Sequence, residues 1–238
     1  METDWNLKAL RDDVERVYGR WQRDAAAPSI DSIVQRRTFA GYHFREAKRI
    51  LDGVIGDREH FEMVGVVMGA YDKEPGEFEW ARIQAAAHIT SCVHSMHSLA
   101  DILAHVIYLC LGMNRNPESE IAARQINLHS VRDRLPSGTI KELVGQLLSH
   151  ENFVYLSALN NHSKHRSIVG VPYSVDLTGE DTEAHGPKFD SFNFDETQHY
   201  QQRWVRPFLT AEFDRQESLL MQIGNALNAE LASRRSRH

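Results

Sequence analysis

The stretch that most constrains the fold runs from residue 77 to residue 112. It is rich in alanine, and between Ile83 and Leu111 the only formal charge is Asp101. A solvated helix face of this length is expected to carry several Lys, Glu or Arg residues. We therefore expect a long central helix that is covered on most sides and ends near Gly112. The histidines and the aspartate within it argue against a membrane span.

The polar residues of this helix share one face. At 100° per residue they fall within an arc of about 80°. They are Thr90, His94, His97, Asp101, His105 and Tyr108. On a covered helix Asp101 would be buried and would need partners, and His97 and His105 each lie one turn away from it. Such a carboxylate can fix a histidine tautomer and hold an imidazolium.

This polar row has three interpretations. It is a structural hydrogen-bond network, a catalytic or nucleic-acid-facing site, or a metal site. In the metal interpretation His94, His97 and Asp101 converge on a divalent ion with a fourth ligand from another segment. The sequence has no HExxH signature and no CxxC pair, so the spacing permits a metal without being diagnostic of one.

The two cysteines, Cys92 and Cys110, lie on the apolar side of the same helix. They are five turns, or roughly 27 Å, apart, so they cannot pair without breaking the helix. We expect buried, inert thiols. The chain begins METDWNLKALRDD, which is charged from the start and predicts no signal peptide. A reducing, cytoplasmic setting fits these features.

Helical periodicity predicts a mainly all-α fold, a multi-helix bundle built around this long helix. Pro28 and its neighbours in 25–29 predict a first break, and Asp31 or Ser32 is the expected cap of the next helix. Further helices are expected over 3–24, 31–55, 118–134, 139–149, 151–166 and 207–235.

The period changes after residue 167. Residues 168–175 and 189–194 predict two strands joined by the polar loop 179–187, a small β hairpin before the C-terminal helix. We expect a single domain over 1–238. Its parts are N-terminal helices (1–76), core helices with a polar motif (77–166), the hairpin (167–196) and the last helix (207–235).

Charge and motifs exclude several function classes. Lys and Arg total 27 against 33 Asp and Glu, a net charge of −6, which disfavours a strongly basic nucleic-acid binder but leaves room for a local basic patch. The chain contains neither a P-loop nor a GxGxxG motif, so no nucleotide cofactor is expected, and we expect no other cofactor. Its 13 histidines predict a charge that changes near neutral pH.

The segment NNHSKHR, residues 160–166, closes a helical stretch. Cations at a helix C-terminus are favoured by the helix dipole, which is a structural explanation for Lys164 and Arg166. The same residues also suit phosphodiester chemistry. A histidine such as His165 can transfer a proton, Lys164 and Arg166 can stabilise charge on the phosphorus centre, and Asn161 can orient a phosphate or an imidazole.

A helical bundle with N-x-x-K-H-R near a helix end, here Asn161 to Arg166, resembles the HEPN superfamily. The similarity is to its uncharacterised bacterial N-x-x-KHR members and covers roughly residues 80–230. It implies a mostly helical fold, frequent dimerisation and, in active members, metal-independent endoribonuclease activity. The usual active motif is Arg, four to six residues, then His. With His165 as that histidine, the arginine positions hold Ala158, Leu159 and Asn160, so Lys164 or Arg166 is the candidate for the missing cation.

The leading hypothesis is a HEPN-like protein that acts on RNA, as a ribonuclease or as a degenerate binding relative. The resemblance also allows a homodimer. His165 is the predicted acid or base, with Lys164 and Arg166 as phosphate ligands and Asn161 as the orienting residue. Asp101 and His97 are predicted to support it. The alternatives are a non-catalytic interaction or scaffold protein and a metal-dependent hydrolase that uses the polar row.

Overall fold

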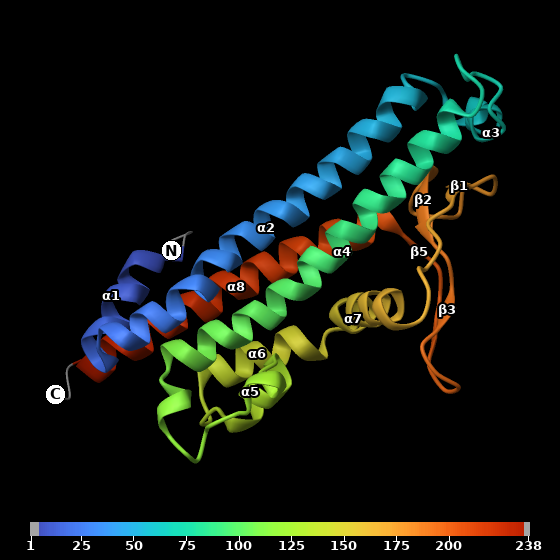
Figure 1. The fold of residues 1–238 in the computed structure, drawn as a ribbon. Coiled ribbons are helices and arrows are strands. Elements are labelled where there is room, and N and C mark those ends of the chain that lie inside the picture. Colours follow the sequence, from blue (N-terminus) through green and yellow to red (C-terminus); the bar gives the residue numbers. More distant parts are fainter. Residues whose placement is uncertain (1–4, 236–238) are drawn as a thin grey trace. The chain divides into compact units, whose positions relative to one another are not determined.

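The computed structural model describes residues 5–235 and is mainly helical, as the sequence predicts (Figure 1). The helices are α1 (Leu7–Tyr18), α2 (Arg20–Ile55), α3 (Met63–Val67), α4 (Glu77–Cys110), α5 (Leu128–Arg134), α6 (Thr139–Ser149), α7 (Glu151–His165) and α8 (Val205–Arg235). Short 3-10 turns lie at His60–Glu62, Met113–Arg115 and Ala123–Gln125. None of the described helices combines the length and apolarity needed to cross a membrane.

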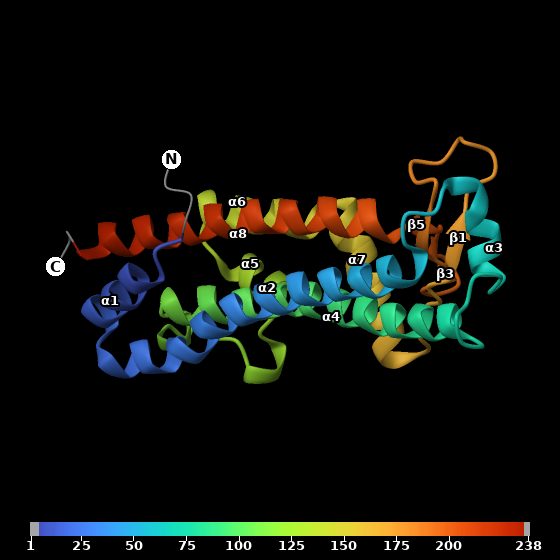
Figure 2. The same ribbon diagram turned by 90° about the horizontal axis from the view of Figure 1, so that it is seen from above.

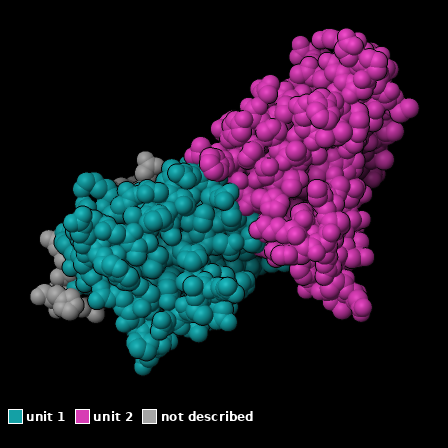
Figure 3. Space-filling view, in the orientation of Figure 1, with its two compact units in different colours: residues 1–37, 96–154, 212–238 teal, residues 38–95, 155–211 magenta. Residues whose placement is uncertain are grey.

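The described chain divides into two compact units, coloured separately in Figure 3. Unit 1 holds the described residues up to Arg37, Met96–Val154 and those from Glu212 onward. Unit 2 holds Thr38–Ser95 and Tyr155–Ala211. Helices α2, α4, α7 and α8 each contribute residues to both units, and each unit is described by itself below. The single domain over 1–238 stays a prediction.

The first break in the chain lies at Gly19, not at the predicted 25–29 segment. Gly19 adopts a φ of +88°, which glycine reaches without steric cost. Helix α2 then runs through Pro28 without interruption, because the alanines before it are strong helix formers. Asp31 and Ser32 consequently lie inside α2 instead of capping a new helix. Trp21, which follows the break in the first turn of α2, is 72% exposed.

The end of α4, in unit 1, is closed by side chains from distant segments. The last carbonyls of a helix have no partner within the helix. Here Tyr18 Oη donates to Leu111 O (2.6 Å) and Gln22 Nε2 donates to Leu109 O (2.6 Å). Arg234 Nη1 also donates to Leu111 O (3.3 Å). Gln22 is fully buried, and its amide also exchanges hydrogen bonds with the side chain of Asn114 (2.8 and 3.2 Å).

A second polar network in unit 1 lies on the core face of α8. Glu212 is fully buried and accepts two bonds from Arg215, Nη2 to Oε1 (2.7 Å) and Nε to Oε2 (2.8 Å). Gln216 donates a third bond to Glu212 (2.8 Å). Arg215 Nη2 also reaches Leu147 O near the end of α6 (3.4 Å). A buried charge needs such pairing, and the sequence analysis did not predict this network.

The predicted helix over 118–134 is shorter in the structure, where α5 begins at Leu128. Asn127 Oδ1 accepts the N–H of Ser130 and Ser130 Oγ accepts the N–H of Asn127, both near 3 Å. This reciprocal capping box fixes the start of the helix. The predicted helices over 139–149 and 151–166 match α6 and α7 closely, with extended His150 between them.

The β structure of unit 2 is larger than the predicted hairpin. Strands β1 (Tyr173–Val175), β2 (His185–Phe189) and β5 (Arg203–Trp204) form an antiparallel sheet in the order β1-β2-β5. Strands β3 (Phe192–Asn193) and β4 (His199–Tyr200) form a separate pair. Helix α3 contacts β1 at one end of this unit (Figure 2).

Strand β2 includes Gly186 and Pro187, which the sequence analysis placed in a loop. Lys188 N donates to Pro172 O (3.0 Å) and Asp176 N donates to Ala184 O (2.8 Å). Hydrogen-bonded and non-hydrogen-bonded pairs alternate along an antiparallel ladder, so Tyr173 and Pro187 face each other at a non-hydrogen-bonded pair. Because no N–H is needed toward β1 there, proline is compatible with the strand.

The strand aromatics pack against the helices of their own unit, as the sequence indicated. Tyr155 of α7 is almost fully buried and makes edge-on ring contacts at centroid distances of 5.0–6.4 Å. Its ring partners are Phe189, Phe192, Tyr200 and Phe208. Arg203 lies over the Tyr155 ring at 4.4 Å.

Gly112→Ala is expected to destabilise the protein by roughly 2 kcal/mol, because left-handed backbone strains alanine. Gly112 has a φ of +66°, and an added Cβ would lie 2.6 Å from Cε1 of Tyr18. Chemical denaturation measures the change. Gly145→Ala in α6 is the matched control, because its Cβ would meet nothing within 4 Å and alanine favours the helix. Equal stability of the two variants would contradict the role of Gly112.

Candidate functional site

The NNHSKHR segment forms the last turn of α7 and the residue after it, in unit 2. Asn160 is fully buried and its Nδ2 lies 3.4 Å from Oδ1 of Asn161. Lys164, His165 and Arg166 are exposed. The negative end of the helix dipole favours these cations. The segment thus changes within one turn from a buried amide to an exposed cationic surface.

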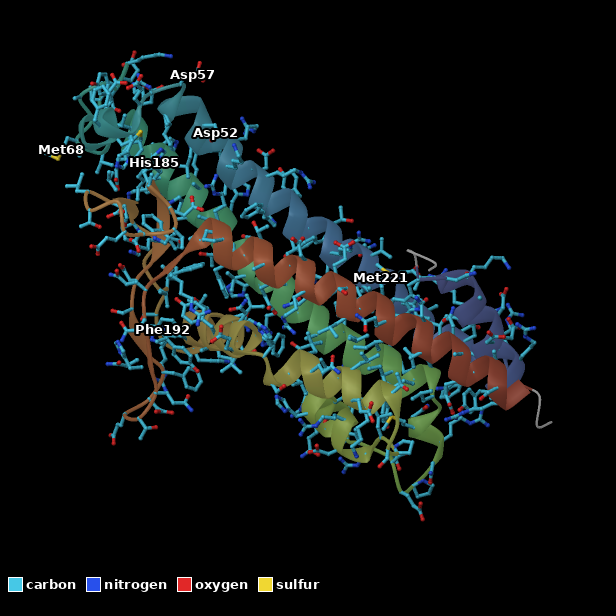
Figure 4. The ribbon with its side chains drawn as sticks, turned by 180° about the vertical axis from the view of Figure 1, so that it is seen from behind. Asp52, Asp57, Met68, His185, Phe192 and Met221 are labelled. Carbon is cyan, nitrogen blue, oxygen red and sulfur yellow. The ribbon has the colours of Figure 1, made fainter. Side chains whose placement is uncertain are left out.

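The two histidines of this segment have different surroundings. His162 Nδ1 lies 2.8 Å from Ser167 O, and its ring meets Phe192 of β3, labelled in Figure 4, edge-on at 5.2 Å. His162 therefore holds the turn that ends α7. His165 is exposed and makes no side-chain hydrogen bond or ion pair with the described part of the chain, so it is the histidine available to a ligand.

Arg166 is placed by an aromatic ring rather than by a carboxylate. Its Cζ lies 5.3 Å from the ring centroid of Phe194, within the range of a cation–π contact. Asp195 follows in the loop. Its pKa lies below the ordinary value, mainly because Thr197 donates to the carboxylate, with a smaller contribution from Arg166. An acidic neighbour thus borders the cationic turn on one side.

Lys164 acts electrostatically on His94 of α4, which belongs to the same unit. The pKa of His94 is lowered from 6.5, first because the ring is partly buried and second because Lys164 is positively charged. This neighbourhood brings one residue of the predicted polar row close to the α7 turn.

The remaining predicted site residues, His97 and Asp101, lie in unit 1. His97 Nδ1 and Asp101 Oδ2 are 3.6 Å apart, and the His97 ring stacks on Phe153 at 6.2 Å. The side chain of Asp101 is 51% exposed, so the expectation of a buried aspartate was wrong. The low charge of α4 reflects burial of its other faces, while this carboxylate is hydrated at the surface. A composite site that joins His97 and Asp101 to His165 stays a prediction.

The metal alternative assigned His94, His97 and Asp101 as ligands. Within residues 5–235, no group of three or more His, Cys, Asp or Glu side chains is placed to hold a metal ion. Tyr108, another member of the row, is buried and its Oη lies 3.3 Å from Ile121 O, which is a structural role.

The cysteines are buried, as predicted. Cys92 and Cys110 are each about 1% exposed or less, and burial raises the pKa of both thiols to about 12. Such thiols are protonated near neutral pH and are poor nucleophiles.

Sequence reasoning missed a cavity of about 270 Å³ in unit 2. Its walls come from the end of α2, from α4, from β1, β2 and β5, and from the start of α8. The lining residues are far apart in the sequence and carry no local motif, so only the fold brings them together.

Comparisons with protein-family models, with curated proteins and with solved structures find no match to this chain.

The lowered pKa of His94 makes stability depend on pH. Because the native ring binds a proton less readily than the unfolded one, the unfolded state takes up more protons below pH 6.5. The stabilising contribution is present above pH 6.5 and decreases as the pH falls toward the native pKa.

Lys164→Gln is expected to raise the pKa of His94 part of the way toward 6.5, since burial still lowers it. An NMR titration of the imidazole measures the change. Lys73→Gln, an exposed lysine of the same unit, serves as the control and should leave His94 unaltered. An unaltered His94 pKa in Lys164→Gln would contradict the proximity of the two residues.

Proposed function

We propose that this chain acts on RNA through the exposed end of α7, as a HEPN-like metal-independent endoribonuclease or as a non-catalytic relative that binds RNA. One observation supports this most directly. Lys164, His165 and Arg166 are consecutive and exposed, and none of them has a carboxylate of the described chain within ion-pair distance. Their charge is thus available to phosphate.

The chemistry assigns each residue a role. Lys164 and Arg166 bind the phosphate oxygens and stabilise the charge that develops on them. His165 takes the proton of a ribose 2′ hydroxyl as this oxygen attacks the neighbouring phosphorus. The bond from phosphorus to the 5′ oxygen of the next nucleotide breaks, this oxygen takes a proton from water, and a 2′,3′-cyclic phosphate remains. Asn161, which shares a helix face with His165, orients the phosphate. His97 and Asp101 keep their supporting role as part of the proposal.

The overall charge limits the kind of RNA binding that is expected. With a net charge of −6, the protein repels a polyanion over most of its surface, so contact is local. Two cations, Lys164 and Arg166, in contact with single-stranded RNA predict a slope of about −1.4 when the logarithm of the binding constant is plotted against the logarithm of the salt concentration.

The proposal also includes a reducing, cytoplasmic setting and a homodimer. Light scattering tests the homodimer.

Cleavage is tested by incubating structured and single-stranded RNA with the protein in EDTA. His165→Ala is expected to lower the cleavage rate by roughly 100-fold or more, because a general acid or base contributes about 10²–10⁴. His129→Ala, an exposed histidine on α5, should retain the wild-type rate. Cleavage that survives in His165→Ala would contradict catalysis at this site.

Binding is tested separately by fluorescence anisotropy with labelled RNA at several salt concentrations. The double variant Lys164→Gln/Arg166→Gln is expected to weaken binding and to flatten the salt slope, and Lys73→Gln should change neither. Binding without cleavage indicates the non-catalytic relative. Wild-type protein that binds no RNA, or binding unaltered in the double variant, would contradict the proposal and favour the scaffold alternative.

The supporting residues are tested in the same cleavage assay. His97→Ala and Asp101→Asn are expected to lower the rate without an equal loss of melting temperature. A change in melting temperature alone would assign them to the architecture of unit 1.

A further inference from the structure

The cavity of unit 2 has an apolar interior. Leu51 and Ile55 of α2 and Ile89 of α4 line it and are almost completely buried. Its volume is about 270 Å³, whereas a cavity of about 150 Å³ accepts benzene. By proportion, the space holds a ligand of roughly ten non-hydrogen atoms. None of the cationic residues at the end of α7 lines it, so this site is independent of the proposed RNA surface.

A hydrogen-bonded pair lies in the wall of the cavity. Tyr173 Oη and His185 Nδ1 are 2.6 Å apart, and the His185 ring stacks on His60 at 6.0 Å. Partial burial, together with the neighbouring His60 and Arg206, lowers the pKa of His185. The ring is therefore neutral near pH 7. If Tyr173 donates to Nδ1, the remaining proton is on Nε2, so that His185 is a hydrogen-bond donor on that side.

The charged residues around the cavity leave an excess of positive charge. Lys48 pairs with Asp52, and Arg206 pairs with Glu183. Figure 4 labels Asp52 on α2 and His185 on β2. Arg58 instead donates to two backbone carbonyls at the end of α2, Val54 O (3.0 Å) and Ile55 O (2.5 Å). Both carboxylates are thus neutralised by ion pairs, while the charge of Arg58 is not.

Two further features favour an anion at the β5–α8 junction. Helix α8 begins at Val205, which lines the cavity, and the N-terminus of a long helix carries partial positive charge. The adjacent Trp204 also lines the cavity and is only 6% exposed. Its Nε1 is buried and has no hydrogen-bond partner among residues 5–235. A buried donor without an acceptor is costly. Nε1 itself has almost no accessible surface, so a ligand oxygen satisfies it after a small shift of the side chains between Nε1 and the cavity.

We propose that this cavity binds a small carboxylic acid with an apolar body of about ten non-hydrogen atoms, a medium-chain or aromatic carboxylate. The carboxylate accepts from Trp204 Nε1 and lies at the N-terminus of α8 near Arg206. The apolar body lies against Leu51, Ile55 and Ile89. A cationic ligand fits less well, because both lining carboxylates are paired while the charge of Arg58 has no carboxylate partner among the lining residues.

Isothermal titration calorimetry of the full chain tests the proposal with octanoate, 1-octanol and octylamine, which differ mainly in the head group. Octanoate is expected to bind at least tenfold more tightly than the other two. Trp204→Phe keeps an aromatic ring but removes the N–H, and is expected to weaken octanoate roughly tenfold, as for a hydrogen bond to a charged group. Trp80→Phe, which alters a tryptophan that is 62% exposed, should bind octanoate like the wild type.

A second pair of variants tests the cavity itself. Ala47 lines it and is buried, so Ala47→Met fills the space and is expected to abolish binding of octanoate. Ala87→Met on the exposed side of α4 is the control. Arg206→Gln alters an exposed side chain, so the protein should fold, and it should weaken octanoate while leaving 1-octanol unaltered. Circular dichroism confirms the fold of each variant.

Three results would overturn the proposal. They are wild-type protein that binds no octanoate, equal binding of the three probes, and octanoate binding that is unaltered in both Trp204→Phe and Arg206→Gln. Since neither residue belongs to the α7 turn, these results would not bear on RNA binding.

Discussion

The unpaired carbonyls at the C-terminal end of α4 determine how unit 1 is organised. Tyr18, Gln22 and Arg234 satisfy them, and these residues come from the end of α1, the start of α2 and the end of α8. Each bond adds only about 1 kcal/mol net, but a buried carbonyl without a donor costs more than that. The last carbonyls of α4 therefore hold together the segments that supply these donors, in addition to hydrophobic contact.

In unit 2 the partners of each cation determine what it can do. Lys48 and Arg206 are paired with carboxylates beside the cavity, so each acts on a bound ligand together with its carboxylate partner. Lys164 and Arg166 have no such partner among the described residues, and an aromatic ring holds Arg166 in place. Residues of the same type are thus paired with carboxylates beside the cavity and have no such partner among the described residues at the end of α7.

Much of the fold could be predicted from the sequence because its signals are local. The apolar periodicity and the stop at Gly112 located α4, and the same reasoning located α6, α7 and the buried cysteines. Gly19 could not be chosen over Pro28 as the first break, because glycine and proline are both helix-ending residues and Pro28 is accommodated inside α2. Asp101 was expected to be buried since its helix lacks other charges, yet neighbouring elements leave that position open.

The NNHSKHR segment could be singled out because its residues are contiguous. The sequence could not show which of its two histidines makes a hydrogen bond within the protein. The cavity could not be found, because residues from α2, β2 and β5 line it and no spacing in the sequence connects them.

Pro187 has a consequence for the accuracy of strand pairing. Its position opposite Tyr173 is one where no N–H is required. A shift of β2 by one residue would move each of its side chains to the other face of the sheet. The N–H groups of its odd-numbered residues would then have to donate to β1, and Pro187 has no N–H to donate. The same shift would carry His185 and Pro187, both of which line the cavity, to the opposite face of the sheet. The proline therefore selects against a misregistered sheet during folding, and the shape of the cavity wall depends on a hydrogen bond that this residue is unable to make.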